Sequence, residues 1–306
     1  MPLSNREPIR DAAGRFEALA AIPFTKMSGS GNDFIVVDNR NGCFPEQNRA
    51  AVIQRLCRRR LSVGADGVVL IEQANSPDIH FRWRYYNADG SEGEMCGNGA
   101  MCAARFAYLQ GIAPARCVFA TPSGRVEAEV EPDSRRVHLR MVDPGPVVVR
   151  QAIAAAGRHV IIHAITVGVP HVVVIVENVE AFAPGAEFLA FGRDIRYHPA
   201  FPNGTNVNVI ARIDGNTLRM RTYERGVEDE TLACGTGAVA SAVVASTLGL
   251  VASPVTVVTT SGLPLTVRFT AKGNRATNVY LGGEARVIAT GVTGPDALAA
   301  TGVVSQ

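Results

Sequence analysis

Apolar side chains recur along this chain at two spacings, one typical of strands and one of helices. Residues 79–85 alternate between apolar and polar side chains, which predicts a strand. Within residues 45–60 the apolar positions recur at helical spacing. Shorter apolar runs predict further strands at residues 34–37, 68–71, 117–120, 125–130 and 137–141. The pattern as a whole favours an α+β protein.

Two longer apolar runs, at residues 100–109 and 238–250, predict helices, and each follows the same short motif. The motif is Cys-Gly-Asn-Gly at residues 96–99 and Cys-Gly-Thr-Gly at residues 234–237, with Glu92 and Glu230 four residues before the cysteines. Gly111 is placed to end the first helix. A thiol at the start of each of two helices is unusual, and the repeated motif suggests that the two thiols form a matched pair.

Other segments repeat at nearly the same distance as the two cysteine motifs, which begin at positions 96 and 234. Thr-Pro-Ser-Gly at 121–124 recurs as Thr-Thr-Ser-Gly at 259–262, at the identical offset. The segment 29–39 has a counterpart at 168–178, where the offset is larger by a single position. Three matches in the same order indicate a tandem duplication. We therefore expect an α+β fold of two pseudo-symmetric lobes, each a β-sheet wrapped around a central helix.

This duplication suggests domain boundaries. They are a leader at residues 1–21, an N-terminal lobe at 22–146, a C-terminal lobe at 147–292 and a tail at 293–306.

Composition narrows the classes of function. The chain has 306 residues, 47% apolar and 19% charged, which suits one large domain or two ordinary ones. A formal charge of +2 gives no general attraction to nucleic acid or to an anionic membrane, and we expect neither partner. Charged residues are scattered through the first twenty positions and interrupt the apolar core that a signal peptide would need. A cytoplasmic location is therefore expected.

The six cysteines contain no C-x-x-C pair, which argues against a zinc site, and no disulfide framework is expected in the cytoplasm. Cys43, Cys57, Cys102 and Cys117 are expected to be buried structural thiols. No P-loop or dinucleotide fingerprint occurs, and the only lysines are Lys26 and Lys272, which leaves no obvious pyridoxal-phosphate lysine. Neither a cofactor nor a metal is expected.

Cys96 and Cys234 have a different chemical setting. A thiol at a helix N-terminus lies near unpaired backbone N–H groups and the positive end of the helix dipole, which favour the thiolate. The adjacent glycines leave those N–H groups accessible to a carboxylate. If the two halves face each other about an approximate two-fold axis, one thiolate removes a proton from a carbon stereocentre while the opposite thiol delivers one to the other face. The product is the mirror-image centre.

Four motifs occur in a characteristic order: Met-Ser-Gly-Ser-Gly-Asn-Asp-Phe at 27–34, Asn-Ala-Asp-Gly-Ser-Glu at 87–92, the Cys96 motif, and residues 223–237 around Cys234. Together they resemble diaminopimelate epimerase, over about residues 24–287. The resemblance implies a cofactor-independent racemase that converts LL-2,6-diaminoheptanedioate, a small amino acid, to its meso form. That product serves lysine biosynthesis and, in many bacteria, peptidoglycan cross-linking. The sequence is compatible with a homodimer.

The resemblance also implies roles for individual residues. Cys96 and Cys234 match the paired acid and base. The implied substrate-binding residues are Asn32, Asn87, Gly97, Asn98, Asn206, Glu224, Arg225, Gly235 and Thr236. Within this set, Arg225 would hold the distal carboxylate, and Glu224 the distal ammonium or a neighbouring thiol. His171 matches a histidine that tunes proton transfer near one thiol.

Spacing alone supports plainer interpretations of some of these residues. The three asparagines lie in turn-like sequences, where an asparagine commonly serves the backbone. His171 also suits a strand start, and Glu224 with Arg225 suits a surface ion pair.

The chain also departs from the family pattern. Ser28 replaces a histidine, Met101 an arginine, Gly67 a glutamine of some members, and Val169 an asparagine. Residues 224–234 are one residue longer than usual. The changes at Gly67 and Val169 remove polar contacts to the distal end of the substrate.

Three alternatives stay open. A proline or hydroxyproline racemase also uses paired thiols, but that family resembles Cys-Gly-His-Gly where this chain has Asn98, and an imino acid offers no distal charge to Arg225. A thiol redox protein would join Cys96 to Cys234 in a regulatory disulfide, so full activity is expected to need a reducing agent. A non-catalytic binding module would not need both thiols.

Overall fold

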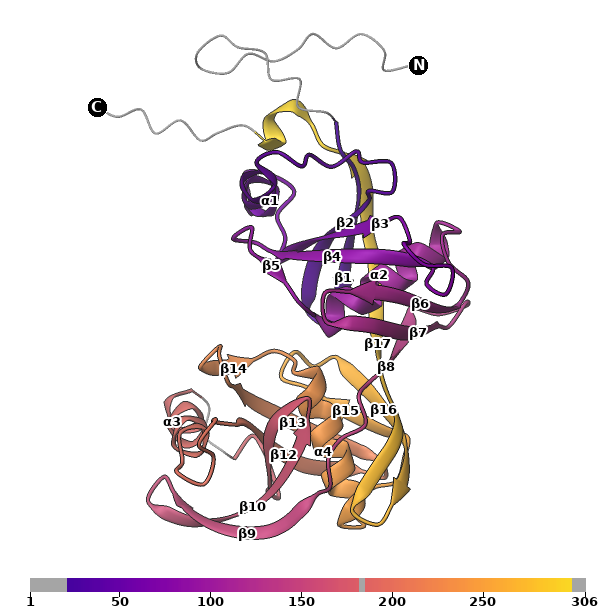
Figure 1. Ribbon diagram of the computed structural model, residues 1–306. Helices are drawn as coiled ribbons and strands as arrows, with labels where there is room; N and C mark the ends of the chain where they lie inside the picture. Colours follow the sequence, from indigo (N-terminus) through magenta and orange to yellow (C-terminus); the bar gives the residue numbers. More distant parts are fainter. Residues whose placement is uncertain (1–20, 182–184, 299–306) are drawn as a thin grey trace, which may run out of the picture. The chain divides into compact units, whose positions relative to one another are not determined.

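The computed structural model describes residues 21–181 and 185–298 (Figure 1). The chain divides into two compact units: unit 1 contains the described residues up to Val130 and those from Ala285 on, and unit 2 contains Glu131–Glu284. The predicted leader lies outside the described residues except for Ala21, and so does the predicted tail from residue 299 on. No helix in the described part of the chain has both the length and the apolar character that a membrane span requires.

Strands outnumber helices in both units. Unit 1 contains β1 (Pro23–Gly29), β2 (Asn32–Asp38), α1 (Arg49–Cys57), β3 (Gly67–Glu72), β4 (Phe81–Asn87), β5 (Glu92–Gly93), α2 (Gly97–Leu109), β6 (Arg116–Thr121), β7 (Gly124–Val130) and a 3-10 turn, η1 (Pro295–Leu298). Unit 2 contains β8 (Arg136–Arg140), β9 (Val148–Ala155), β10 (Arg158–Val167), β11 (Val169–Ile175), α3 (Ala186–Arg196), β12 (Asn206–Asp214), β13 (Thr217–Glu224), β14 (Asp229–Thr231), α4 (Gly235–Thr247), β15 (Val255–Val258) and β16 (Pro264–Lys272). The last strand, β17 (Arg275–Val292), runs from unit 2 into unit 1.

The two units have the same strand topology. In unit 1, β2 pairs parallel with β3, β3 antiparallel with β4, β4 parallel with β6, and β6 antiparallel with β7. In unit 2, β11, β12, β13, β15 and β16 repeat these pairings in the same order. Helices α1 and α3 hold equivalent places in the order, as do α2 and α4. The chain therefore consists of tandemly duplicated α+β units.

Helices α2 and α4 are buried around most of their circumference. Helix α2 contacts β1, β2, β3 and β7, and α4 contacts β10 to β13 together with β15 and β16. Every α4 residue from Gly237 to Ala245 is buried. Alanine and glycine dominate both helices, and small side chains let strands approach a helix from several sides. Burial of the middle of each helix holds the helix, and the cysteine before it, in a defined place within each unit.

Most predicted elements of the first half are confirmed, with bounds shifted by a few residues. Helix α2 ends at Leu109, and Gly111 follows it with a left-handed φ of 67°. Helix α1 is shorter than the predicted stretch because Asn48, just before it, is left-handed with φ 53°. Helix α3 and the length of β17 were not predicted. Strand β17 pairs with β16 and β8 up to Glu284 and with β1 from Ala285 on.

Candidate active site

Cys96 and Cys234 occupy equivalent positions, each as the residue that caps a buried helix. Cys96 precedes α2 and Cys234 precedes α4, and both have extended backbone conformations. The backbone N–H that follows each motif, at Ala100 or Ala238, donates to the carbonyl of the cysteine. All six cysteines of the chain are thiols rather than disulfides. The prediction of a thiol at each of two helix starts is confirmed.

The Cys234 thiol is buried and holds its proton tightly. Its Sγ accepts a hydrogen bond from Gly237 N at 3.4 Å and lies 3.6 Å from Thr236 Oγ1. Burial nevertheless raises the pKa of Cys234 to about 12, and the charge of Glu224 adds to the rise, while the contacts with Thr236 and Gly237 lower it. The expectation of a thiolate is wrong for Cys234, because desolvation outweighs the hydrogen bonds from the helix N–H groups, which do lower its pKa.

Cys96 differs from Cys234 in exposure. Cys96 is half-buried, and its side chain does not cap α2, whereas the Cys234 side chain caps α4. The charge of Cys96 affects the phenol of Tyr85. Burial raises the pKa of Tyr85, and the charges of Cys96 and Asp66 contribute to the rise. The two thiols thus begin in different electrostatic settings although the fold around them is duplicated.

The glutamates that precede the two thiols perform the same structural task. Glu92 accepts two hydrogen bonds from Arg84 of β4, at 2.7 and 2.7 Å, and Glu230 accepts two from Arg221 of β13, at 2.8 and 2.6 Å. Thr260 also donates to Glu230, at 2.9 Å. Each pair ties the cysteine loop to the preceding strand. Bidentate arginine–carboxylate pairs are geometrically specific, so they fix the loop as well as stabilise it.

Glu230→Gln is expected to lower the free energy of unfolding by about 2 kcal/mol, because it replaces the carboxylate that pairs with the buried Arg221 guanidinium by a neutral amide. Glu92→Gln is the matched control. Its arginine is more exposed, with side-chain exposures of 31% for Arg84 and 7% for Arg221, so the loss should stay below about 1 kcal/mol. Urea unfolding of both variants measures the difference. Equal losses would contradict the conclusion that the Glu230–Arg221 pair stabilises the fold more than the Glu92–Arg84 pair.

In unit 1, Asn32 and Asn98 are in direct contact. Asn98 Nδ2 donates to Asn32 Oδ1 at 2.8 Å, and Asn32 Nδ2 donates to Asp66 at 3.1 Å. Asp66 is held in turn by Arg59, at 2.8 Å. Asp66 therefore orients an asparagine of the candidate site.

Asn87 is held by the strands around it. Its Oδ1 accepts from the Tyr85 hydroxyl at 2.8 Å and its Nδ2 donates to Ser91 Oγ at 3.0 Å. Gly67 is paired with Asn87 across β3 and β4. A Cβ at Gly67 would come within 2.7 Å of the Tyr85 ring, so this ring fills the space that a longer side chain at position 67 would need.

In unit 2, the side chain of Asn206, the first residue of β12, forms hydrogen bonds with backbone groups of neighbouring segments. Asn206 Oδ1 accepts from Arg225 N at 2.8 Å, and Asn206 Nδ2 donates to Pro170 O at 3.3 Å. Glu224 accepts from Thr231 Oγ1 at 2.9 Å. Burial raises the pKa of the Glu224 carboxyl. Glu228, in the turn between β13 and β14, is left-handed with φ 60°.

Asn32, Asn87 and Asn206 share one arrangement of their side-chain amides. In each, Oδ1 accepts a hydrogen bond and one Nδ2–H is donated to a protein acceptor. Among the described residues the second Nδ2–H of each amide is left for a ligand. In each unit, an oriented amide N–H donor of this kind suits a carboxylate oxygen.

His171 lies in β11, and only 1% of it is exposed. Its Nδ1 is 3.2 Å from Asn208 Nδ2, and its Nε2 has no hydrogen-bond partner in the described part of the chain. Burial lowers the pKa of His171 to about 3, and the charge of Arg225 lowers it further. The ring is therefore neutral at physiological pH.

This lowered pKa predicts a loss of stability in acid. Below pH 6.5 the unfolded chain binds a proton at His171 that the folded chain does not bind until about pH 3, so stability is lost as the pH falls. Between pH 7.5 and 5.0 the loss from this group should be about 2 kcal/mol. His171→Gln should remove that part of the loss. Urea unfolding at both pH values measures it, and an unchanged pH slope in the variant would refute the assignment.

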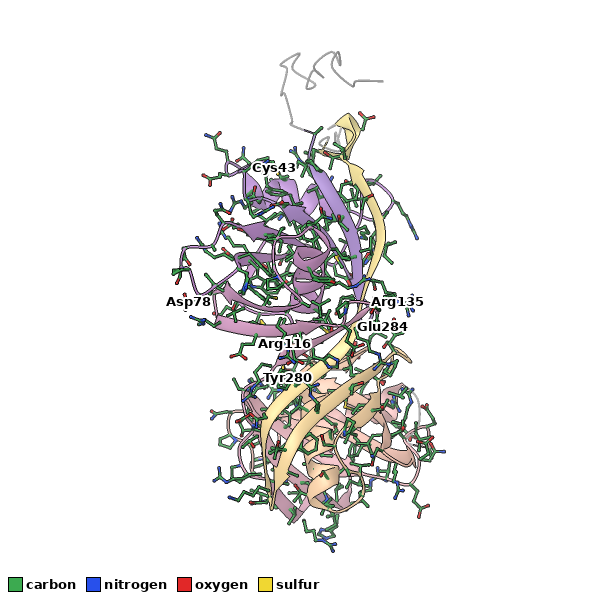
Figure 2. All side chains as sticks on the ribbon, turned by 90° about the vertical axis from the view of Figure 1, so that its right-hand side faces the viewer. Cys43, Asp78, Arg116, Arg135, Tyr280 and Glu284 are labelled. Carbon is green, nitrogen blue, oxygen red and sulfur yellow. The ribbon has the colours of Figure 1, made fainter. Side chains whose placement is uncertain are left out.

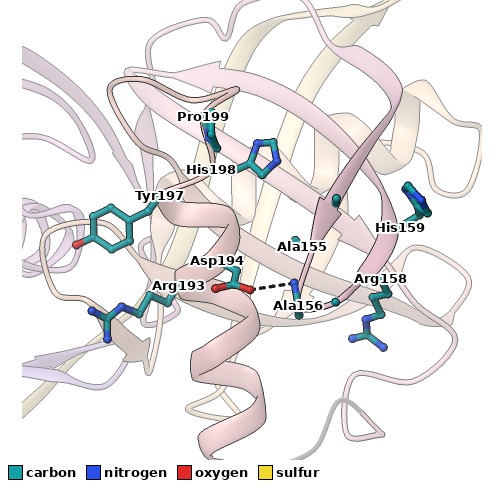
Figure 3. A pocket seen from close by; sticks show the side chains of 11 residues that line it. Ala155, Ala156, Arg158, His159, Arg193, Asp194, Tyr197, His198 and Pro199 are labelled. Carbon is teal, nitrogen blue, oxygen red and sulfur yellow. Dashed lines mark hydrogen bonds between the residues drawn. The ribbon is translucent and has the colours of Figure 1, made fainter.

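A hollow of about 680 Å³ in unit 2 is not part of this site (Figure 3). Arg158 and Arg193 line it, but their side chains point to opposite sides, and Asp194 accepts a hydrogen bond from Ala156 N at 2.9 Å. None of the candidate residues lines it. Within the described residues, no group of three or more His, Cys, Asp or Glu side chains is arranged to hold a metal ion.

Two residues next to the candidate set were missed, and one expectation is wrong. Asn208 contacts His171, and Tyr85 contacts Asn87. Both stand two positions from a named asparagine along a strand, so the period-2 pattern could have placed them on the same face. Cys57, Cys102 and Cys117 are buried as expected, but Cys43 is only half-buried in unit 1, where its Sγ lies 3.2 Å from Asp38 O (Figure 2).

Comparison with known proteins agrees with this architecture. The family model for diaminopimelate epimerase matches residues 24–149 and 163–288, two stretches whose offset is close to that of the sequence repeat. In solved structures, a phenazine biosynthesis protein of the PhzF family from Bacillus anthracis has a TM-score of 0.63 at 14% identity, covering 89% of this chain and 98% of that one. A hydroxyproline epimerase from Agrobacterium vitis has a TM-score of 0.58 at 16% identity, covering 90% and 92%. These identities show a shared fold.

Closer relatives are found by sequence. The diaminopimelate epimerase of Aquifex aeolicus is 43% identical, over 80% of this chain and 89% of its own length. That of a Hydrogenobaculum species is 46% identical, over 78% and 88%. Because the family model covers most of the chain and these relatives match over nearly their full length, the chain belongs to the diaminopimelate epimerase family.

Proposed function

We propose that this chain epimerises LL-2,6-diaminoheptanedioate to the meso form with Cys96 and Cys234 as its two bases. The observation that carries the proposal is the thiol that precedes the buried helix in each copy of a duplicated fold. The proposal includes the finer description of that fold, in which the two lobes are pseudo-symmetric and each sheet wraps around its helix. The two thiols act on opposite faces of one substrate carbon, and no cofactor takes part.

The unequal settings of the thiols assign their first roles. Burial raises the pKa of Cys234, so Cys234 enters the reaction as a thiol and delivers its proton to the substrate carbon. Cys96, the more exposed of the two, enters as the thiolate and removes the proton from the other face. In the reverse direction the two roles exchange, because the Cys234 thiolate left by the first turnover is then the base.

The reacting carboxylate accepts hydrogen bonds from the first backbone N–H groups of α2 and α4, at Gly97, Asn98, Gly235 and Thr236. These dipoles are fixed before the substrate binds, and they stabilise the negative charge that develops when the carbon loses its proton. Asn32, Asn87 and Asn206 present the remaining amide N–H donors.

Recognition of the distal end falls to Arg225 and Glu224. Arg225 is positioned by Asn206 through its backbone N–H and by Asn203 O, which accepts from its guanidinium at 2.9 Å. It binds the distal carboxylate, and Glu224 faces either the distal ammonium or Cys234, whose pKa it affects. Tyr85 supplies bulk beside Gly67, and Val169 contributes no polar contact, so Arg225 and Asn87 carry more of this recognition than the family pattern implies.

The product of this reaction serves lysine biosynthesis and peptidoglycan cross-linking. We place the enzyme in the cytoplasm, with a small amino acid as its partner and neither nucleic acid nor membrane. A homodimer is compatible with the proposal.

Incubation of the purified chain with LL-2,6-diaminoheptanedioate in D₂O tests the proposal. The expected product is the meso isomer with solvent deuterium at the inverted carbon, without added metal or cofactor. Chiral chromatography with mass spectrometry measures both isomer and label. Absence of the meso isomer, or inversion only of proline or hydroxyproline, would overturn the assignment.

A further inference from the structure

His171 has one ring nitrogen in contact with the protein and one that is buried without a partner. Nδ1 lies 3.2 Å from Asn208 Nδ2, while Nε2 has no hydrogen-bond partner among the described residues. An unpaired polar atom in a side chain this deeply buried costs free energy unless a ligand satisfies it. The position of the proton on this ring therefore decides what kind of ligand atom it can meet.

Asn208 determines that proton position. Its Nδ2 also lies 3.0 Å from Val172 O, and its Oδ1 accepts from Thr222 Oγ1 at 3.0 Å. A backbone carbonyl can only accept, so the amide nitrogen must face Val172 and cannot exchange places with the oxygen. The second Nδ2–H of Asn208 points at His171 Nδ1, which must then be an unprotonated acceptor. In the neutral ring the proton is left on Nε2.

We infer that Asn208 is a positioning residue that holds His171 as the neutral Nε2–H tautomer, a hydrogen-bond donor toward a negatively charged substrate atom. The inference rests on the proposed function for the identity of that atom, and on unit 2 alone for the geometry. Protonation of Nδ1 would set one N–H against another, so Asn208 opposes the imidazolium form. The charge that acts on the ring, that of Arg225, opposes it as well. His171 thus donates a hydrogen bond and does not serve as the general base.

Asn208 also connects this donor to the thiol helix. A Cβ at Gly237, in the first turn of α4, would overlap Asn208 Oδ1, so the amide packs directly against the turn that Cys234 begins. The Asn208 side chain is fully buried. A displacement of that turn would therefore disturb the His171 ring as well.

Long-range ¹⁵N–¹H correlation spectra of the full chain labelled at its six histidines test the inference. The His171 signals are assigned by their loss in His171→Gln. The expected pattern is a protonated Nε2 and an unprotonated Nδ1, constant between about pH 5.5 and 8.5, where an ordinary histidine titrates. A protonated Nδ1, a mixture of tautomers or a titration within that range would overturn the inference.

Asn208→Asp provides the matched test. Its carboxylate accepts from Nδ1–H, so the tautomer should switch and a His171 titration should enter the observed range. Thr222→Val is the control, since it removes the donor to Oδ1 but leaves both Nδ2 contacts, and it should keep the wild-type pattern. The kcat of Asn208→Asp should fall about 10-fold or more, since one oriented donor is lost. If the Asp variant does not fold, the wild-type spectrum decides. The spectra do not depend on turnover, so an inactive chain with the expected pattern would count against the proposed function alone.

Discussion

Replacing Cys234 by alanine is expected to lower kcat for epimerisation by about 10³-fold or more. The loss follows from the proposed division of labour: with Cys96 as base, no other group delivers a proton to the opposite face of the carbon. General acid–base catalysis contributes about 10²–10⁴-fold for each positioned group. Cys96→Ala should cause a loss of the same size. Formation of the meso isomer from the LL substrate measures both.

Cys234→Ala should still exchange hydrogen on one face. In D₂O, its Cys96 thiolate can remove a proton from the LL substrate and return a deuteron to the same side of the carbon, so label enters without inversion. In Cys96→Ala the base that faces this proton is missing, so neither label nor inversion is expected from the LL substrate. Cys43→Ala is the control, because Cys43 is a half-buried thiol that is not part of the candidate site, and it should match the wild-type chain. Wild-type turnover in either Cys96→Ala or Cys234→Ala would exclude the two-base mechanism.

The duplication and the two thiols could be predicted because they depend on local sequence. A cysteine followed by glycines and then by small apolar residues predicts a helix start, and its recurrence at Cys234 after Cys96 predicts a second copy. Residues such as Gly111 mark helix ends by their left-handed backbone, which is also a local property. The folded chain keeps these helix starts and ends because the packing around α2 and α4 stabilises the same helices that the local sequence favours.

Properties that depend on burial could not be predicted in the same way. The helix start was expected to favour a thiolate at Cys234, yet burial raises the pKa of that thiol. The balance between desolvation and a few N–H groups depends on how much protein covers the sulfur, which spacing does not reveal. Helix α3 was not predicted, because only a few of its residues, including Phe188 and Phe191, are buried and they lie among charged residues in the sequence. Its apolar pattern is therefore weak.

The asparagines show the limit of local interpretation most clearly. Asn32, Asn87 and Asn206 were predicted in turn-like sequences, where an amide usually serves its own backbone. Two of them instead bind residues far away in the chain, as Asn32 does with Asp66 and Asn98 and Asn206 does with Arg225. Asn87, by contrast, is held by Tyr85 and Ser91, which are close in sequence. Orienting an amide requires partners on both of its atoms, and only the folded chain supplies them together.

The first turn of α4 should tolerate no side chain at position 237, and Gly237→Ala tests this. The added Cβ would overlap Asn208 Oδ1 and would lie 3.2 Å from Cys234 Sγ. Asn208 cannot move aside without losing its contacts to His171, Val172 and Thr222, so the free energy of unfolding should fall by about 3 kcal/mol. Since the same shift disturbs both the thiol and the His171 ring, kcat/KM should fall about 100-fold or more.

Gly97→Ala is the matched control for stability, because a Cβ at Gly97, at the start of α2, meets nothing within 4 Å. Its free energy of unfolding should stay within about 0.5 kcal/mol of wild type, since an unhindered alanine is at least as favourable in a helix as glycine. Urea unfolding of both variants, followed by far-UV circular dichroism, measures the contrast. If Gly237→Ala were as stable as Gly97→Ala, Asn208 would be able to move away from the new methyl group. The first turn of α4 and the His171 ring would then not be coupled by their packing.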